Sequence, residues 1–293
     1  MLRAVYAPLL VALSFLTLLP VGVSQPTDTE ISRSRGWYPL VGLLYGLALL
    51  GLVSLWTLVL AVPFFMPALA ALLVVALAVA NRFLHLDGLM DFCDAMWGGH
   101  TVDRRLEIMR DSHVGSFAVA GCVSVLLLKF AALASLLIVP TGLSGLLFFP
   151  MVSRWSMTLL LTVFPYGRQQ GIGSAFVSSG RPWLATGFAL LTVVAVAWFL
   201  LGLVGILVLV VVSAASLLLG WWTVRRLGGG LTGDCYGATN EMMEAVALLL
   251  LLVLLWRFEL AGMSVAVGFG GGILTDVPWP IGYQSGWFSY SAR

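Results

Sequence analysis

Long apolar runs alternate with short polar segments along most of this chain. About 20 residues is the helix length that crosses a hydrocarbon core roughly 30 Å thick. Apolar runs of about this length occupy residues 38–60, 62–82, 114–138, 143–164, 183–201, 203–222 and 242–262. Lipid offers the backbone no hydrogen-bond partners, and such uniformly apolar runs are unlike barrel strands. The pattern predicts an all-α fold: a polytopic transmembrane helical bundle of seven to eight spans, with cytosolic acidic helices.

The eighth span depends on the N-terminal apolar segment, which follows Arg3 and ends near Pro20, Gly22 and Ser24. This order imitates a cleavable signal peptide. Basic residues argue against cleavage, because they recur in four polar segments that are separated from one another by two spans each. These segments are 25–36, 82–113, 165–182 and 223–241. The positive-inside rule places all four in the cytoplasm, so the first segment is expected to be retained.

Composition agrees with a membrane protein. The 293 residues are 60% hydrophobic and 10% charged, with a mean hydropathy of +1.03, far from the averages of soluble domains. A net charge of +2 without a basic tract gives no reason to expect nucleic acid as a partner. The lipid bilayer is the expected partner, and assembly into a homo-oligomer is left open.

The first polar block, residues 85–113, holds six of the 13 acidic residues and all three histidines. Asp87, Asp91 and Asp94 are spaced i, i+4, i+7, which brings their carboxylates to one face of a helix. Clustered like charges destabilise a helix unless something neutralises them. The spacing therefore predicts a cation site.

A second short helix is expected within the same block. Gly98-Gly99 should end the helix that bears the aspartates, and Asp103 should cap a helix over 104–110. Glu107 and Asp111 would then share a face.

The second polar block, residues 228–244, joins a glycine-rich turn to Asp234, Glu241 and Glu244. Glycines allow the backbone to approach phosphates closely. Carboxylates in a first helical turn are also favoured by the helix dipole alone, so both interpretations remain open for Glu241 and Glu244. Asp234 precedes the apolar helix and is the stronger candidate for chemistry.

The third block places ionisable groups inside apolar runs, at Lys129 and Arg154, before the segment Pro165-Tyr166-Gly167-Arg168. A charged residue inside a span costs roughly 2.5–3.5 kcal/mol on insertion scales. Each therefore needs a partner in the bundle or a route to the interface. Arg154, which follows Pro150 and Ser153, is the better candidate for an anionic ligand, and Lys129 is expected to be a packing or snorkelling residue.

Together these blocks resemble the cobalamin-5'-phosphate synthases, also called adenosylcobinamide-GDP ribazoletransferases. The resemblance covers about residues 10–255 and keeps the order of the motifs. These are 14–20, 38–42, 85–89 with Asp91 and Asp94, 106–112 with Gly115, Ser153-Arg154, Pro165-Tyr166 with Arg168, and 231–234 with Gly237, Ala238 and Glu241. Leu18 departs from the pattern, which usually has a basic residue there. Residues 1–262 are thus expected to form one membrane-embedded catalytic domain, followed by a C-terminal tail, 263–293, that matches nothing in the family.

The resemblance implies an Mg²⁺-dependent transferase of the bacterial or archaeal cytoplasmic membrane, with its active site facing the cytoplasm. It would join adenosylcobinamide-GDP to α-ribazole, or to α-ribazole 5'-phosphate, and release GMP. Asp87, Asp91 and Asp94 would hold the metal, and Asp111 or Asp234 would act as the base. The expected substrate-binding residues are His85, Arg110, His113, Arg154, Arg168 and Glu241, with Trp97, Trp155 and Tyr236 as candidate contacts of the corrinoid.

Two other functions compete with this one. The acidic helix is also similar to that of CDP-alcohol phosphotransferases of phospholipid synthesis, although Leu89-Met90-Asp91 stands where their pattern has an Ala-Arg pair. A cation-coupled transporter would also combine Lys129 and Arg154 with clustered carboxylates. It is expected to place ionisable groups near the bilayer midplane on several helices.

Overall fold

The computed structural model describes residues 3–60, 66–139, 141–167 and 182–260. Its elements in order are α1 (Arg3–Leu16), α2 (Asp28–Ser34), η1 (Arg35–Trp37), α3 (Tyr38–Leu60), α4 (Met66–Ala80), α5 (Leu84–Gly98), α6 (Val102–Ile108), α7 (Ser116–Leu136), α8 (Gly142–Val163), α10 (Pro182–Arg226) and α11 (Gly233–Leu260). Within these ranges β pairing is limited to an isolated bridge between Tyr166 and Leu231. The predicted all-helical fold is confirmed.

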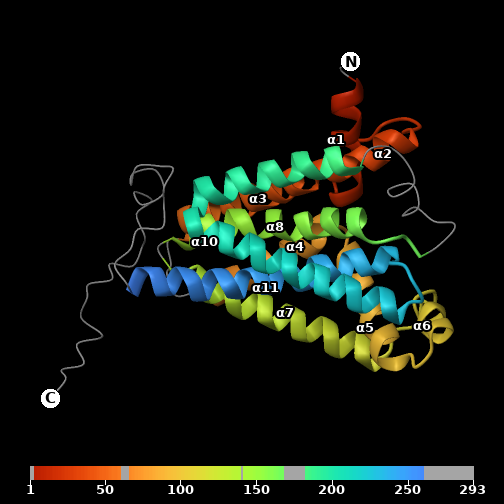
Figure 1. The fold of residues 1–293 in the computed structure, drawn as a ribbon. Helices are drawn as coiled ribbons and strands as arrows, with labels where there is room; N and C mark the ends of the chain where they lie inside the picture. The colour runs from red at the N-terminus through yellow and green to blue at the C-terminus, as the bar shows by residue number, and fades with distance from the viewer. Residues whose placement is uncertain (1–2, 61–65, 140, 168–181, 261–293) are drawn as a thin grey trace.

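Long helices lie side by side, and the shorter α5 and α6 gather at one end of the bundle (Figure 1). The stretches long and apolar enough to cross a membrane are Asp28–Val59, Ser116–Leu136, Gly142–Val163, Trp183–Arg226 and Gly233–Phe258, and α4 with α5 makes a sixth if this pair, bent by 90°, is one span. This count does not confirm the predicted seven to eight spans. The 14 residues of α1 measure about 21 Å at 1.5 Å per residue, less than the core thickness.

The helix α10 folds back on itself at Gly202, as Figure 1 shows. Gly202 has φ 54° and ψ −131°, a backbone conformation that is readily reached only without a Cβ atom. Beyond the turn, Gly205 lies against Ala197, and a Cβ on Gly205 would sit 3.0 Å from the Ala197 Cα. The two arms of this hairpin correspond to the separate apolar runs predicted at 183–201 and 203–222.

The most enclosed of the long apolar helices is α8, which packs against α3, α10 and α11. Of the 18-residue apolar stretch within α8, 83% is buried. Small residues make the contact with α3 close. A Cβ on Gly46 would lie 2.7 Å from the Leu147 Cα, and one on Gly42 would lie 2.6 Å from the Met151 Cα. In lipid, where helices gain little from burying apolar surface, such close backbone packing stabilises association.

A tight turn between α4 and α5 directs the acidic helix out of the bundle. Arg82 and Phe83 have φ of 58° and 59°, and the chain bends there by 90°. The Arg82 guanidinium fixes the turn by donating to the carbonyls of Ser14, at 3.0 Å, and Thr17, at 2.9 Å. As a result α5 lies at the end of the bundle with its aspartates near the surface.

Candidate active site

The acidic motifs of α5 and α11 lie against each other. A Cβ on Gly88 would be 2.9 Å from the carbonyl oxygen of Asp234, and one on Gly237 would be 3.2 Å from the Cα of His85. Glycine on each helix allows the backbones to approach this closely. Asp87 and Asp91 therefore come from one wall of the site, and Asp234 comes from the other.

The third sequence block joins the same place. Gly167 N–H donates to Leu231 O at 2.8 Å, and Leu231 N–H donates to Pro165 O at 2.9 Å. Residues 165–167 thus run beside the glycine-rich turn that precedes Asp234. The structure brings three sequence-distant motifs together, while Arg168 lies outside the described residues.

The helix α6 packs on this turn. Its N-cap is Thr101, whose hydroxyl accepts from Arg104 N–H at 3.2 Å. The predicted cap at Asp103 is therefore wrong: Asp103 lies within the first turn, because the chain already turns at Thr101. The buried Arg105 donates to Arg226 O at 3.1 Å, and the hydroxyl of Thr232 contacts the Met109 sulfur at 3.6 Å.

Asp94 caps another helix. Its Oδ2 accepts from Gly115 N–H at 2.6 Å, and its Oδ1 accepts from Ala118 N–H at 2.8 Å. Both donors belong to the start of α7, where N–H groups have no helical partner and the helix dipole favours negative charge. The expected helix over Asp87, Asp91 and Asp94 is present and ends at Gly98, as predicted, but Asp94 is already engaged with the backbone.

The carboxylates of α5 do not form a closed metal cage in the described part of the chain. Among the described residues, no three His, Cys, Asp or Glu side chains are grouped closely enough to hold a metal ion. Asp87 is exposed and Asp91 is half-buried on α5. Mg²⁺ is usually bound through one or two carboxylates, with water and substrate phosphates completing its shell. Asp87 and Asp91 fit such an open site in the kind of ligand they offer.

The segment between α6 and α7 carries an Asp–His pair. Asp111 Oδ1 lies 2.5 Å from His113 Nδ1 and accepts from His113 N–H at 3.1 Å. The hydrogen bond to His113 lowers the pKa of the Asp111 carboxyl, and Asp111 in turn raises the pKa of His113. Arg110, at the end of the turn after α6, is exposed beside them. The predicted helix over 104–110 instead runs from Val102 to Ile108, so Asp111 does not share its face with Glu107.

The structure places His85 in the interior. Only 1% of its surface is exposed, and the side-chain amides of Asn81 and Asn240 contact its Nδ1 at 3.2 and 3.0 Å. Neither asparagine was expected from the sequence. A single amide in an apolar run does not indicate which residue it will bind. A role for His85 in binding substrate stays a prediction.

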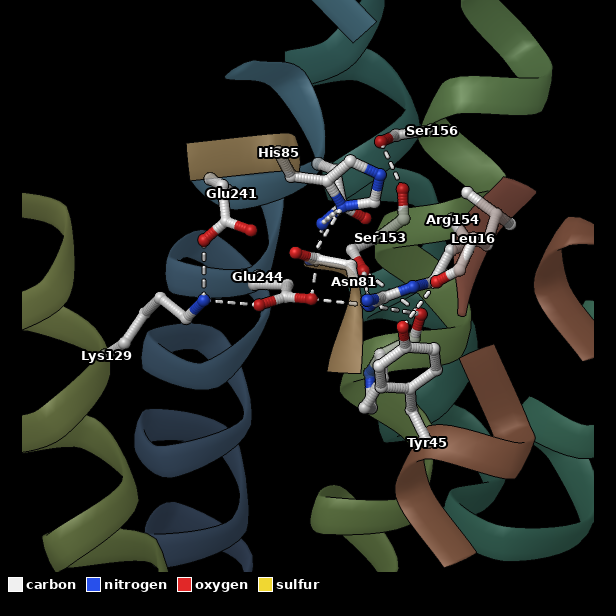
Figure 2. A network of polar contacts seen from close by, with 12 residues as sticks. Leu16, Tyr45, Asn81, His85, Lys129, Ser153, Arg154, Ser156, Glu241 and Glu244 are labelled. Atoms are coloured by element: carbon white, nitrogen blue, oxygen red, sulfur yellow. Dashed lines mark hydrogen bonds and ion pairs between the residues drawn. The ribbon is translucent and has the colours of Figure 1, made fainter. Parts of the chain in front are cut away.

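Beneath the acidic motifs lies a buried network of four charges (Figure 2). Lys129 on α7 reaches Glu241 at 2.7 Å and Glu244 at 2.5 Å, both on α11. Arg154 on α8 pairs with Glu244 and lies over the Tyr45 ring, 4.4 Å from its centroid. Two positive and two negative charges balance, so the partners that Lys129 and Arg154 require inside the bundle are the two glutamates.

The aromatic candidates for corrinoid contact separate by exposure. Trp97 is 58% exposed at the end of α5 and packs edge-on against Trp222, with ring centroids 6.0 Å apart. Trp155 and Tyr236 are buried, and the Trp155 Nε1–H donates to Ser213 Oγ at 2.9 Å. Of the three, Trp97 is the one that a ligand at the surface can reach.

Comparison with known proteins identifies the family. A family model described as cobalamin-5-phosphate synthase matches residues 8–252. The chain belongs to the cobalamin-5-phosphate synthase family. It is 40% identical over 248 residues to an adenosylcobinamide-GDP ribazoletransferase of Desulfitobacterium hafniense (strain Y51), covering 82% of this chain and 94% of the relative. A relative of the same name from Pseudomonas putida (strain GB-1) is 43% identical over 244 residues, covering 83% and 97%.

A third relative, from Geotalea daltonii (strain DSM 22248 / JCM 15807 / FRC-32), has the same printed name and is 40% identical over 249 residues, covering 85% of this chain and 98% of the relative. No solved structure matches the chain. The part shared with the cobalamin-5-phosphate synthase family contains every site described above.

Family membership confirms the resemblance seen in the sequence. It favours this family over the CDP-alcohol phosphotransferases and over a transporter. The buried charges do lie on several helices, as expected for a transporter, but Lys129 and Arg154 pair with Glu241 and Glu244. In this chain the balanced network joins α7, α8 and α11 beneath the acidic motifs.

Proposed function

We propose that this chain is an adenosylcobinamide-GDP ribazoletransferase. It joins adenosylcobinamide-GDP to α-ribazole, or to α-ribazole 5'-phosphate, and releases GMP, which completes the nucleotide loop of cobalamin. The observation that carries the proposal is the contact of Gly88 with Asp234, which brings the acidic motifs of α5 and α11 to one end of the bundle. This arrangement occurs in a chain about 40% identical, over most of its length, to relatives named for the activity.

The chemistry requires neutralisation of charge at a pyrophosphate. Mg²⁺, when bound, would neutralise the phosphate oxygens of the substrate, and we propose Asp87 and Asp91 as its protein ligands. Asp94 contributes by holding the start of α7 in place. The exposed Arg110 is placed to bind a phosphate oxygen, for which the guanidinium fork is suited.

In the proposed reaction, a ribose hydroxyl of the acceptor attacks the phosphorus that bears cobinamide. The bond from this phosphorus to the GMP oxygen breaks, and GMP leaves with the electron pair. A protein group accepts the hydroxyl proton. From the sequence alone, Asp234 and Asp111 are the carboxylates expected near this proton, and the hydroxyl of Thr232 orients Asp234 by donating to its Oδ2 at 3.2 Å.

Charge supports the proposed membrane placement. Arg104 and Arg105 belong to α6, and Arg225 and Arg226 end α10 beside it, where Arg105 donates to Arg226 O. Since basic residues are retained on the cytoplasmic side, we propose that the site faces the cytoplasm from the cytoplasmic membrane. Both substrates are polar and would reach it from water.

The experiment is GMP release by the purified protein in detergent, given adenosylcobinamide-GDP, α-ribazole and Mg²⁺. We expect metal-dependent release coupled to a corrinoid product, abolished by EDTA and by Asp91→Asn. Asp28→Asn is the matched control, because Asp28 is an exposed carboxylate in the first turn of another helix, α2. A folded wild-type protein that forms no GMP would overturn the proposal.

A further inference from the structure

The segment from Arg110 to Val114 is fixed at both ends to the two walls of the site. Before it, Met109 contacts Thr232, whose hydroxyl also donates to Asp234. After it, Gly115 N–H donates to Asp94 on α5. At most about 3.6 Å of chain per residue keeps His113, two residues from Gly115, close to the carboxylate of Asp94. The Asp111–His113 pair therefore belongs to a segment whose two ends are held by the two acidic motifs.

The geometry of the pair leaves one imidazole nitrogen ready to accept a proton. The Asp111 carboxylate is only an acceptor when ionised, so the 2.5 Å contact with Nδ1 places the single proton of the neutral imidazole on Nδ1. The lone pair is then on Nε2. The His113 side chain is 90% exposed, and that of Asp111 is 52% exposed, so Nε2 is open to a substrate. A carboxylate that orients an imidazole is the arrangement by which enzymes prepare a histidine base.

Resting on the function proposed above, we propose that His113 is the general base of the transfer and that Asp111 is its positioning residue. Nε2 takes the proton of the attacking ribose hydroxyl as the new O–P bond forms and the bond to GMP breaks. The resulting imidazolium is stabilised by Asp111 and returns its proton to water after GMP leaves.

The other groups at the site are less suited to this role. Asp94 accepts two backbone N–H groups, and Asp87 and Asp91 are assigned to the metal. Asp234 accepts a hydrogen bond from the Thr232 hydroxyl, and a carboxylate is a weaker base than an imidazole. An imidazole titrates near neutral pH, where a general base is most effective. Asp111 is the charged group that raises the pKa of His113. Arg104 helps to lower the pKa of Asp111 and is itself paired with Glu107 at 2.7 Å.

A purely structural role for the pair makes a different prediction. Asp111 also accepts the backbone N–H of His113, which closes an Asx turn after α6. That turn needs the Asp111 carboxylate and no imidazole. If the turn were the whole function of the pair, His113→Ala would be tolerated.

The test compares His113→Ala with His100→Ala in the full-length protein, using GMP release at saturating Mg²⁺. His100 is the matched control, because it is an exposed histidine of the same polar block outside the proposed machinery. We expect kcat to fall by about 10²- to 10⁴-fold for His113→Ala, with little change in KM, and added imidazole to restore part of the lost kcat. If His113→Ala does not fold, His113→Gln replaces it in the same comparison.

The outcomes separate the two proposals. Turnover by wild type and His100→Ala, with a loss in His113→Ala that imidazole rescues, supports the base. Equal kcat in all three proteins, or a loss that imidazole does not rescue, overturns the base and leaves the transferase activity standing. Absence of turnover in folded wild type and folded His100→Ala overturns the proposed function, and the assignment of His113 with it.

Discussion

The backbone of Gly88 on α5 lies directly against the backbone of Asp234 on α11. A Cβ at position 88 would come within 2.9 Å of the Asp234 carbonyl oxygen and 3.1 Å of its Cα. These atoms are backbone and cannot rotate away. The separation of the two acidic motifs is therefore set by the absence of a side chain at one position, next to the proposed metal ligand Asp87.

We expect Gly88→Ala to lower activity sharply and to destabilise the fold by about 1–3 kcal/mol, the usual effect of overpacking. The added methyl group would push α5 away from α11 and separate Asp87 and Asp91 from Asp234. Gly98→Ala is the matched control, because a Cβ at Gly98 of the same helix would meet its nearest atom at an ordinary 3.7 Å. GMP release and thermal unfolding in detergent measure both effects, and equal behaviour of the two variants would contradict the close approach.

Asp94→Ala is expected to destabilise the protein by about 0.5–2 kcal/mol, because the first N–H groups of α7 lose their cap. Asp87→Ala, which removes an exposed carboxylate from the same helix, should change stability by less than about 0.5 kcal/mol. The thermal midpoint of each variant, measured without Mg²⁺, gives the comparison. Matching losses in the two variants would show that Asp94 does not act as a cap.

Lys129→Met should be among the most destabilising single changes, by roughly 3–5 kcal/mol, because it leaves two buried glutamates facing one arginine. The double variant Lys129→Met/Glu241→Gln restores the charge balance with Arg154 and Glu244 and should recover much of this loss. Unfolding in detergent measures both. A double variant less stable than the single one would argue against a balanced network.

The Asp111–His113 contact predicts a pH dependence. The pKa of His113 is raised above its ordinary 6.5, so its stabilising contribution is complete below about pH 6.5 and is lost as the pH rises through the folded-state pKa. The pKa of Asp111 is lowered from 3.8, so its contribution is present above about pH 3.8 and is lost as the pH falls through the folded-state pKa. The pair is thus fully formed between these two values.

Asp111→Asn is expected to lower the pKa of His113 toward its ordinary value, since the carboxylate that stabilises the imidazolium is gone. NMR titration of the imidazole C–H signals in detergent measures this, with the His113 signal assigned by its loss in His113→Ala. Glu107→Gln is the control, because Glu107 pairs with Arg104 rather than with His113. An unchanged His113 titration in Asp111→Asn would mean that the contact does not form.

Local pattern identified the helices and the acidic block. The i, i+4, i+7 spacing of Asp87, Asp91 and Asp94 indicated a helix, and Gly98-Gly99 its end, because both depend on residues a few positions apart. The Asp103 cap was wrong by two residues, since Thr101 is also a residue type that caps helices, and its hydroxyl accepts the N–H of Arg104.

The partners of these residues depended on tertiary structure. The sequence indicated that Lys129 and Arg154 need carboxylates, because lipid makes an unpaired charge costly, but Glu241 lies 112 residues from Lys129 and no periodicity connects them. Asp94 shares a helix face with the other aspartates, yet its hydrogen-bond donors are the backbone N–H groups of Gly115 and Ala118 at the start of α7. The sequence determined which segments are helical in a bilayer and which residue types need neutralisation. The packing of the helices decided which charges meet, because contact between distant residues depends on the path of the whole chain.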